Sequence, residues 1–350
     1  MKPRRVFVHG AAVSMSWADA SFSLEELIFK GVKRALHASK TCIDAVDSVV
    51  LAAHDLVDGR SLSSMVTAPA AGAYLRDEIR LAEDGLVALS LAGARVAAGE
   101  SELSIVAAWG RASEGDFLSQ SRAAMDPFLV QPFGLTEADI SAFRLSRWLG
   151  AHGPQDEARV RAAEMRLARA RQNPRAIDTS APLLPLNAPL RVDEAPRCAD
   201  IVVAALVGSR ESACHISGIG HGTDATLVGD RDWLERPALR TAVEQALGEA
   251  RLSLEDLDLF EIDGMTLADE ALALEAIGLA EPGDGFGLYA RSDRINPSGG
   301  SAAGWCYPAM GLVRFAECLL RLDAGGKRGL AVGSSPIGDQ AQTAVVLEVA

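Results

Sequence analysis

The sequence predicts an α/β protein that consists of two similar halves with a helical insertion between them. Residues 32–51 resemble residues 243–262 at a constant offset of 211. Residues 85–108 resemble residues 311–334 at an offset of 226. Chance explains two matches in the same order much less readily than it explains one. Helical periodicity alternates with short apolar runs in both halves, which is typical of layered α/β proteins, so we expect an internal duplication.

The first half contains two predicted helices and two predicted strands. Amphipathic spacing predicts a helix over 24–38, and a turn leads from it to the β-branched run 46–51. A second helix is expected over 85–98, because Gly99 is a favourable residue just after a helix end. Residues 103–108 are mostly apolar and predict a buried strand.

The second half repeats this order of elements. Helices are expected over 237–250 and 309–323, and strands over 257–262 and 329–333. Residues 345–349 add a closing strand. The repeated order supports the duplication that the two internal matches indicate.

The segment between the halves, at about 112–195, has a different character. It contains an arginine-rich helix at 157–176 and then a proline-rich connection that leads back to the second half. We divide the chain into a first half at 1–111 plus about 196–199, an insertion domain at 112–195, and a second half at 200–350.

Composition narrows the class of protein. The 350 residues include 34 Lys and Arg against 47 Asp and Glu, a net charge of −13, which argues against nucleic-acid binding because that requires neutralised phosphates. The five cysteines show no C-x-x-C spacing, so we expect no metal site and no disulfide framework. No run approaches the roughly 20 apolar residues of a membrane span. We expect a cytoplasmic protein that binds neither nucleic acid nor membrane.

Five short motifs follow one another in a recognisable order. The most specific are Asn-Pro-Ser-Gly-Gly at 296–300 and the Asn-Pro pair at 173–174. The others are Pro-Leu-Arg at 189–191, a glycine-rich strand opening at 216–224 and Glu-x-x-Gly-Leu at 275–279. Together they resemble the thiolase superfamily, in particular its sterol-carrier-protein-type branch. The resemblance covers nearly the whole chain and implies a duplicated thiolase fold, with αβαβα layers and an inserted loop domain.

The resemblance implies a particular chemistry. Such enzymes join or cleave carbon–carbon bonds of acyl-CoA substrates, with a cysteine that takes the acyl group and His/Cys groups that move protons at the α-carbon. A thiolate is both a good nucleophile near neutral pH and a good leaving group from a thioester. A poised acid–base is needed for the α-proton.

This sequence lacks that set of residues. The slot of the nucleophile, just before the helix at 85–98, holds Ala82 and is followed by Glu83 and Asp84. Two carboxylates suit the positive end of a helix dipole, but they would repel a thiolate or an enolate. The three other vacated slots hold Asp263, Trp305 or Cys306, and Pro336. The loss of these four catalytic residues together implies that thiolase chemistry has been abandoned.

Some residues near these slots are candidates for a different mechanism. Steroid side-chain retro-aldolases, relatives of this superfamily, place a tyrosine in the equivalent loop as an acid–base, which makes Tyr307 a candidate. Asp263 is a candidate base, with a turn cap as its alternative role. We expect Cys306 to be a small buried hydrophobe and Trp305 to fill the space where a substrate would lie. His54, like the other histidines, lies outside the motifs and is expected to be structural or at the surface.

The arginine-rich helix offers a candidate site for the phosphates of coenzyme A. Arg159, Arg166 and Arg169 are spaced to share one helix face, and the planar guanidinium fork suits phosphate. The alternative is a solvated face with charge pairs along the helix. If the patch is exposed, reversing Arg166 and Arg169 to glutamate should abolish binding of coenzyme A and leave the melting temperature nearly unchanged.

Three functions remain open at this stage. The first is a non-catalytic subunit of a hetero-oligomeric acyltransferase complex. The second is an active acyl-CoA carbon–carbon lyase or acyltransferase of altered mechanism that uses Tyr307 and Asp263. The third is a module that binds coenzyme A or lipid without chemistry. We expect no covalently bound cofactor, and coenzyme A or an acyl-CoA as the ligand.

The resemblance also suggests partners. Chains of this branch often work in hetero-complexes, so we expect an active thiolase or ketosynthase-like subunit, with a small zinc-ribbon/OB-fold protein as a further partner. Thiolases dimerise by pairing sheet edges, and catalytic residues can decay in one subunit while its interface is kept. Residues 59–80 match the loops that cross into the neighbouring subunit, so we expect a dimer or a higher oligomer.

Overall fold

The structure is a computed structural model that describes residues 4–58, 64–335 and 338–349. The first half contributes five strands to the sheet, with helices between them. Its elements are β1 (Val6–Ser16), α1 (Leu24–Ala38), β2 (Ser48–Ala52), α2 (Asp55–Asp58), α3 (Ser64–Ala70), β3 (Asp77–Leu81), α4 (Gly85–Ala98), β4 (Leu103–Arg111) and β5 (Asp200–Gly208).

The second half and the insertion make up the rest of the described chain. The insertion contains α5 (Phe117–Ala124), α6 (Glu137–His152) and α7 (Asp156–Gln172). The second half contains β6 (Cys214–Thr223), α8 (Pro237–Ala250), β7 (Leu259–Ile262), α9 (Leu267–Ala276), α10 (Gly285–Arg291), α11 (Met310–Leu322), β8 (Arg328–Ser334) and β9 (Ala341–Val349).

The strand order reveals the duplication. The sheet runs β3-β2-β4-β5-β1-β6-β9-β8-β7, so β2-β4-β5-β1 in one half mirrors β7-β8-β9-β6 in the other. In both sets the first pair is parallel and the next two are antiparallel. Both β1 and β6 carry a register shift, at Val8/Gly10 and Ile216/Gly218. The predicted duplicated α/β fold is confirmed.

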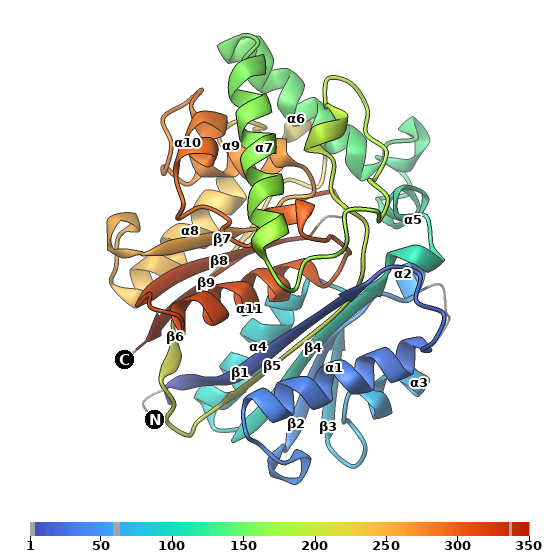
Figure 1. The fold of residues 1–350 in the computed structure, drawn as a ribbon, viewed down its shortest axis with the longest axis vertical. Coiled ribbons are helices and arrows are strands. Elements are labelled where there is room, and N and C mark those ends of the chain that lie inside the picture. Colours follow the sequence, from blue (N-terminus) through green and yellow to red (C-terminus); the bar gives the residue numbers. More distant parts are fainter. Residues whose placement is uncertain (1–3, 59–63, 336–337, 350) are drawn as a thin grey trace.

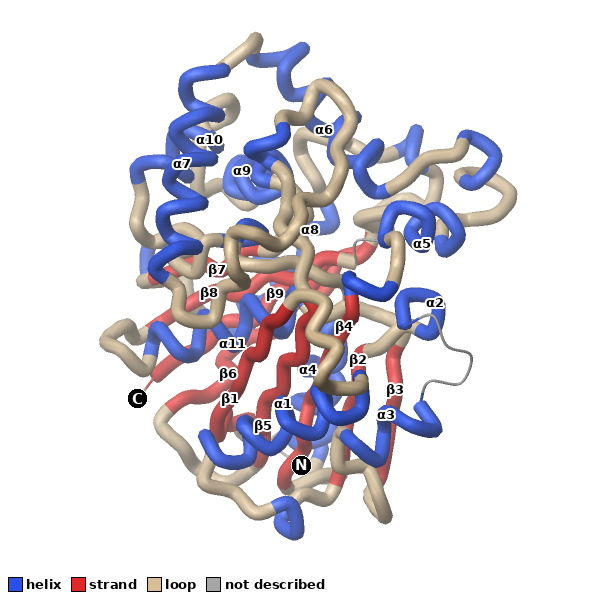
Figure 2. The backbone as a smooth tube through the Cα atoms, turned by 45° about the vertical axis from the view of Figure 1, so that its right-hand side comes forward, coloured by secondary structure: helices blue, strands red, loops and turns tan. Residues whose placement is uncertain are grey.

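The two halves meet along a short seam. Strands β1 and β6 pair only through Val6–Val8 and Cys214–Ile216, and beyond the seam the two parts of the sheet diverge. Helices α4 and α11 contact each other and strands of both parts, so they form a shared middle layer (Figure 1). Helix α1 covers the outer face of one part and α8 that of the other (Figure 2). The result is the expected αβαβα arrangement.

Strand β5 moves the division between the halves. It lies between β4 and β1 and pairs antiparallel with both, so it completes the sheet of the first half. We had placed residues from 200 onward in the second half. Strand pairing instead groups Asp200–Gly208 with the first half, because its backbone pairs with β4 along one edge and with β1 along the other, and the second half begins at β6.

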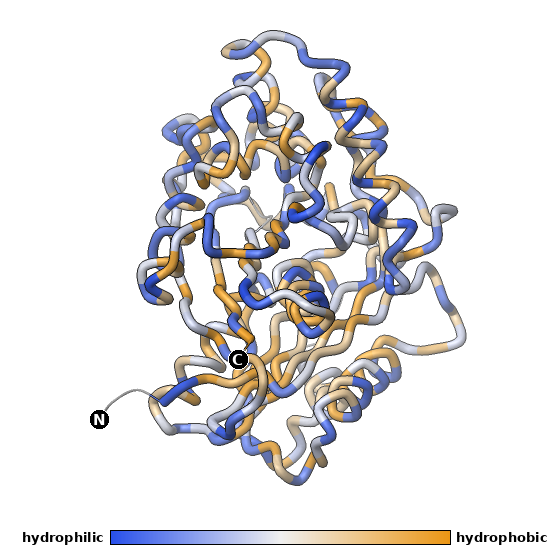
Figure 3. The backbone as a smooth tube through the Cα atoms, turned by 60° about the vertical axis from the view of Figure 1, so that its left-hand side comes forward, coloured by the Kyte–Doolittle hydropathy of each residue, from blue (hydrophilic) through white to orange (hydrophobic). Residues whose placement is uncertain are grey.

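Local sequence explains how the middle layer is built. The Asp84 carboxylate accepts the backbone N–H of Leu86 at 2.8 Å and starts α4, and Gly99, at φ 79°, ends it in the left-handed conformation. Almost every residue of α11 is buried. Figure 3 shows mainly hydrophobic strands in the central body.

No helix in the described ranges combines the length and apolarity that a bilayer crossing requires.

Candidate active site

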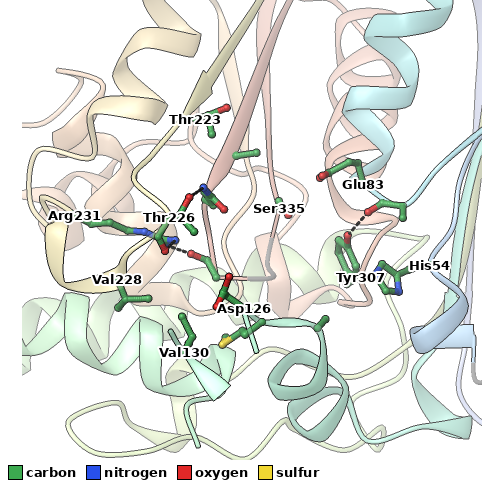
Figure 4. Close-up of a pocket in the computed structure, with 16 residues that line it drawn as sticks. His54, Glu83, Asp126, Val130, Thr223, Thr226, Val228, Arg231, Tyr307 and Ser335 are labelled. Carbon is green, nitrogen blue, oxygen red and sulfur yellow. Dashed lines mark hydrogen bonds between the residues drawn. The ribbon is translucent and has the colours of Figure 1, made fainter. Parts of the chain in front are cut away.

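A cavity of about 420 Å³ opens between the start of α4, the loop before α11 and the loop after β8 (Figure 4). The insertion closes one side of it through the end of α5 and the residues that follow. This volume is within the usual range for sites that bind small molecules. The lining residues are His54, Ala82, Glu83, Ala124, Met125, Asp126, Val130, Thr223, Thr226, Val228, Arg231, Tyr307, Ser335, Gly338, Gln340 and Ala341.

Ala82 and Glu83 form the wall at the start of α4. Ala82 is exposed and offers no nucleophile. The half-buried Glu83 side chain follows it, and burial raises the pKa of its carboxyl, while the nearby Ser335 side chain opposes that effect. A carboxyl with a raised pKa is a candidate proton acceptor or donor near neutral pH.

Tyr307 faces the same wall. Its side chain is almost fully buried, and its hydroxyl donates to the Ala82 carbonyl at 3.4 Å (Figure 4). Burial raises the pKa of Tyr307 far above its usual value, and the nearby carboxyls of Glu83 and Asp84 raise it further. The phenol therefore stays protonated, and Tyr307 is suited to donate a proton rather than to act as a free base.

His54 is a lining residue that the sequence analysis missed. It follows the end of β2, and its ring lies 6.1 Å from that of Tyr307. Burial lowers the pKa of His54, which keeps the imidazole neutral near pH 7. The available signal was its position at the carboxyl end of a parallel strand, where side chains of α/β sites gather.

Asp84 lies behind the cavity wall, where the two middle helices begin. Its carboxyl accepts the backbone N–H of Leu86 at 2.8 Å and of Gly311 at 2.9 Å, so it caps α4 and also contacts the start of α11. A Cβ atom on Gly311 would lie 1.9 Å from an Asp84 oxygen, so only glycine fits there. Burial, together with the Asp263 carboxyl, raises the pKa of Asp84 to about 8.

Asp263 is close enough to Asp84 to affect its pKa, and it is not among the residues that line the cavity. It is buried and accepts the Ser334 hydroxyl at 3.1 Å. Burial raises its pKa to about 7. Asp263 does not line the cavity beside Tyr307, so Glu83 takes the position that we had expected Asp263 to hold.

Trp305 and Cys306 are not among the residues that line the cavity. The Trp305 ring packs edge-on against Phe117, with ring centroids 4.7 Å apart. The Cys306 sulfur lies over Gly110, where a Cβ atom would be only 2.4 Å from it. Burial raises the pKa of the Cys306 thiol, so Cys306 is a buried hydrophobe, as expected. Trp305 is not among the residues that line the cavity, and the expectation that it fills the space where a substrate would lie stays a prediction.

Comparison with known proteins identifies the fold. No family profile and no curated protein sequence matches the chain. Among solved structures, the chain is similar to an Ltp2-ChsH2(DUF35) aldolase, with a TM-score of 0.81, 18% identity and coverage of 100% of this chain and 99% of that one. It is also similar to human mitochondrial 3-ketoacyl-CoA thiolase, with a TM-score of 0.75, 16% identity and 99% coverage of both chains.

A third similar structure is the Bacillus anthracis acetyl-CoA acetyltransferase, with a TM-score of 0.75, 15% identity and coverage of 100% of both chains. All three similarities extend over essentially the whole length of the chain. The chain has the thiolase fold. The architecture that the motifs predicted is therefore confirmed, while the chemistry of this thiolase-fold protein has to be argued from its own residues.

The arginines that we had assigned to coenzyme A phosphates are buried inside this thiolase fold. Arg159 donates to both carboxylate oxygens of Glu194, at 2.8 and 2.7 Å, and to the Pro189 carbonyl at 3.0 Å. Arg159 is 4% exposed and Glu194 is fully buried. The guanidinium is used to hold the connection after α7 against the helix.

Arg166 and Arg169 are committed in the same way. Arg166 donates to the Ser301 hydroxyl at 2.9 Å and to two backbone carbonyls of the connection at 3.0 Å. Arg169 donates to three backbone carbonyls around the end of α10, at 2.7 to 3.1 Å. The expected exposed phosphate-binding face is wrong, because partners from distant segments cover all three arginines. Reversing Arg166 and Arg169 should therefore destabilise the fold.

One vacated slot of the thiolase family remains to be placed. Pro336, in the slot of the second cysteine, lies outside the described residues. Its neighbour Ser335 is described and lines the cavity.

In the ranges that the structure describes, no group of three or more His, Cys, Asp or Glu side chains is placed to hold a metal ion.

Proposed function

We propose that this chain is a carbon–carbon lyase of the aldolase type that acts on β-hydroxyacyl thioesters. The observation that carries the proposal is the pairing of Glu83 and Tyr307 on one wall of an open cavity, beside the vacated nucleophile slot at Ala82. The similarity to a solved aldolase, at a TM-score of 0.81, supports it. A structure of human mitochondrial 3-ketoacyl-CoA thiolase in complex with CoA, at a TM-score of 0.74, supports a CoA thioester as substrate.

The reaction needs one base and one acid. Glu83 takes the proton of the β-hydroxyl, the Cα–Cβ bond breaks, and its electron pair passes to the thioester as an enolate. The β-carbon leaves as an aldehyde or ketone. Tyr307 then donates its phenolic proton to Cα, which completes the acyl thioester product. The raised pKa of Glu83 favours proton uptake, and the protonated phenol of Tyr307 supplies the acid.

Replacement of Tyr307 tests the proposal directly. We expect Tyr307→Phe to lower kcat for cleavage of 3-hydroxyacyl-CoA by roughly 10²–10⁴-fold, because it removes the general acid. Glu83→Gln should have a loss of the same order. The matched control is Tyr74→Phe, at an exposed tyrosine outside the cavity lining, which should retain activity. Release of the carbonyl product is measured, and full activity of Tyr307→Phe would refute the proposal.

The same geometry predicts that thiolase activity is absent and is not restored by one substitution. Ala82→Cys should give no thiolysis of acetoacetyl-CoA, because Asp84 already occupies the helix start that would stabilise a thiolate and Glu83 would repel one. The assay follows consumption of acetoacetyl-CoA in the presence of free CoA. Thiolysis above the wild-type background would contradict the prediction.

A second candidate is a subunit of a hetero-oligomeric complex, and one surface favours it. Strand β3 lies at the edge of the sheet, and Tyr74 and Leu75 beside it are 71% and 87% exposed. Open sheet edges with apolar side chains pair readily with another chain. The partner would be a thiolase or ketosynthase-like chain, or a DUF35 protein like the ChsH2(DUF35) named with the similar aldolase. Co-purification read by mass tests this, and turnover by the purified chain alone favours the lyase.

A further inference from the structure

The imidazole of His54 has one ring nitrogen inside the protein and one that is left to meet a ligand. Nδ1 is buried and has no hydrogen-bond partner. A proton on Nδ1 therefore makes no hydrogen bond, whereas a proton on Nε2 can be donated to an acceptor in the cavity that His54 lines. Burial lowers the pKa of His54 and keeps the ring neutral, so it offers a single N–H.

The main chain holds His54 in place beside Tyr307. The backbone carbonyl of His54 accepts the N–H groups of Val57 and Asp58, both at 2.9 Å, where α2 begins. The rings of His54 and Tyr307 have centroids 6.1 Å apart and are tilted by 53° to each other (Figure 4). The imidazole is therefore fixed next to the group that is proposed to protonate Cα.

Other nitrogen donors in the cavity are engaged elsewhere. The side chains of Arg231 and Gln340 both donate to the segment at 224–226. Figure 4 shows Arg231 on the far side of the cavity from Tyr307. His54 is thus the nitrogen donor of the lining that lies beside Tyr307.

The proposed cleavage needs a donor at this place. When the Cα–Cβ bond breaks, negative charge collects on the thioester oxygen, while Glu83 acts on the β-hydroxyl and Tyr307 acts on Cα. Fixed hydrogen-bond donors stabilise such charge strongly in a site that excludes water. The thioester carbonyl is bonded to Cα, so its donor has to lie close to Tyr307, as His54 does.

We propose that His54 is a catalytic residue that donates a hydrogen bond from Nε2 to the thioester oxygen as the enolate forms, a role that rests on the proposed lyase function. The Nε2–H bond stays intact, so the proton balance of the cleavage is unchanged. Glu83 still receives the hydroxyl proton, and Tyr307 still gives one to Cα. The same hydrogen bond polarises the carbonyl of a bound thioester that cannot be cleaved, which makes the contact measurable without turnover.

The experiment measures kcat for cleavage of 3-hydroxyacyl-CoA and the infrared carbonyl stretch of bound butanoyl-CoA labelled with ¹³C at its carbonyl. We expect His54→Phe to lower kcat by roughly 10²–10³-fold with a much smaller change in KM, because it removes a donor to the developing charge. The carbonyl stretch of the bound thioester should lie at lower frequency in the wild type than in His54→Phe.

Two amide variants differ only in reach. His54→Gln should recover the lower carbonyl stretch and at least about tenfold of the rate, because its amide N–H can take the place of Nε2. His54→Asn carries the same amide one methylene shorter and should be as slow as His54→Phe. The matched control is His37→Phe, at an exposed histidine of α1 outside the cavity lining, which should keep the wild-type rate.

The outcomes separate the role of His54 from the lyase. Cleavage by the wild type with an unchanged rate or an unchanged carbonyl stretch in His54→Phe would overturn the role of His54 and leave the lyase standing. Equal rates in His54→Gln and His54→Asn would do the same, and this pair carries the comparison if His54→Phe does not fold. A wild type that cleaves nothing would overturn the lyase, and the role of His54 with it. Loss in His54→Phe with recovery in His54→Gln supports the role.

Discussion

Arg159→Met is expected to lower the free energy of unfolding by about 3–5 kcal/mol. The substitution keeps most of the side-chain volume but leaves the fully buried Glu194 carboxylate without its bidentate partner. An uncompensated buried charge costs far more than a lost surface contact, which explains the size of the effect. Chemical denaturation with intact protein measures it.

The same helix supplies the control for this prediction. Arg161 pairs with Glu157 one turn away, but both side chains are mostly exposed, at 68% and 80%. Arg161→Met should therefore change stability by at most about 0.5 kcal/mol. The double variant Arg159→Met/Glu194→Leu should recover much of the loss, because it removes both charges. Equal effects of Arg159→Met and Arg161→Met would contradict the buried role of Arg159.

Stability should fall as the pH rises from about 5 to about 9, because of the buried Asp84. Its pKa is raised to about 8 in the folded protein, above the value of 3.8 for an ordinary aspartate. The folded state therefore binds more protons than the unfolded state between these two pKa values. The stability that protonated Asp84 contributes is complete below pH 3.8, the pKa of the unfolded state, and is lost as the pH rises through about 8. The titration of this one proton lowers the free energy of unfolding by at most about 1.4 kcal/mol per pH unit.

Asp84→Asn tests this assignment. The amide has the shape of the protonated acid, but Leu86 and Gly311 donate to different oxygens of Asp84, so the single amide oxygen accepts only one of these N–H groups. The variant should therefore lose some stability at every pH and keep its fold. Melting temperatures measured across this pH range should decline less steeply in the variant than in the wild type. Some slope should remain, because Asp263 has a pKa raised to about 7. An unchanged slope would show that Asp84 does not titrate in this range.

Helix positions could be predicted because their signals are local. The expected helices at 24–38, 85–98 and 237–250 coincide with α1, α4 and α8. Each has an amphipathic pattern in its own residues, and α4 also has a capping aspartate and a terminal glycine close by. The internal matches likewise predicted the duplication, because both copies of a duplicated unit keep the same pattern.

Burial of charge could not be predicted, because it depends on partners that are distant in the sequence. Arg166 reaches Ser301, 135 residues away, and Arg159 reaches Glu194, 35 residues away. Helical spacing places these arginines on one face but does not say what covers that face. The same difficulty applies to which of Trp305, Cys306 and Tyr307 lines the cavity. Trp305 packs against Phe117 and Cys306 against Gly110, and both partners are distant in the sequence.

The position of β5 has a consequence for how the chain folds during synthesis. This strand lies inside the sheet of the first half, yet it is encoded after the whole insertion. Until Gly208 has been made, β4 and β1 have no strand between them, and their facing edges remain unpaired. Closing so long a loop has an entropic cost before the new contacts form, and non-local pairing of this kind is slow. The first half therefore cannot fold as an independent unit while the ribosome is still making the insertion.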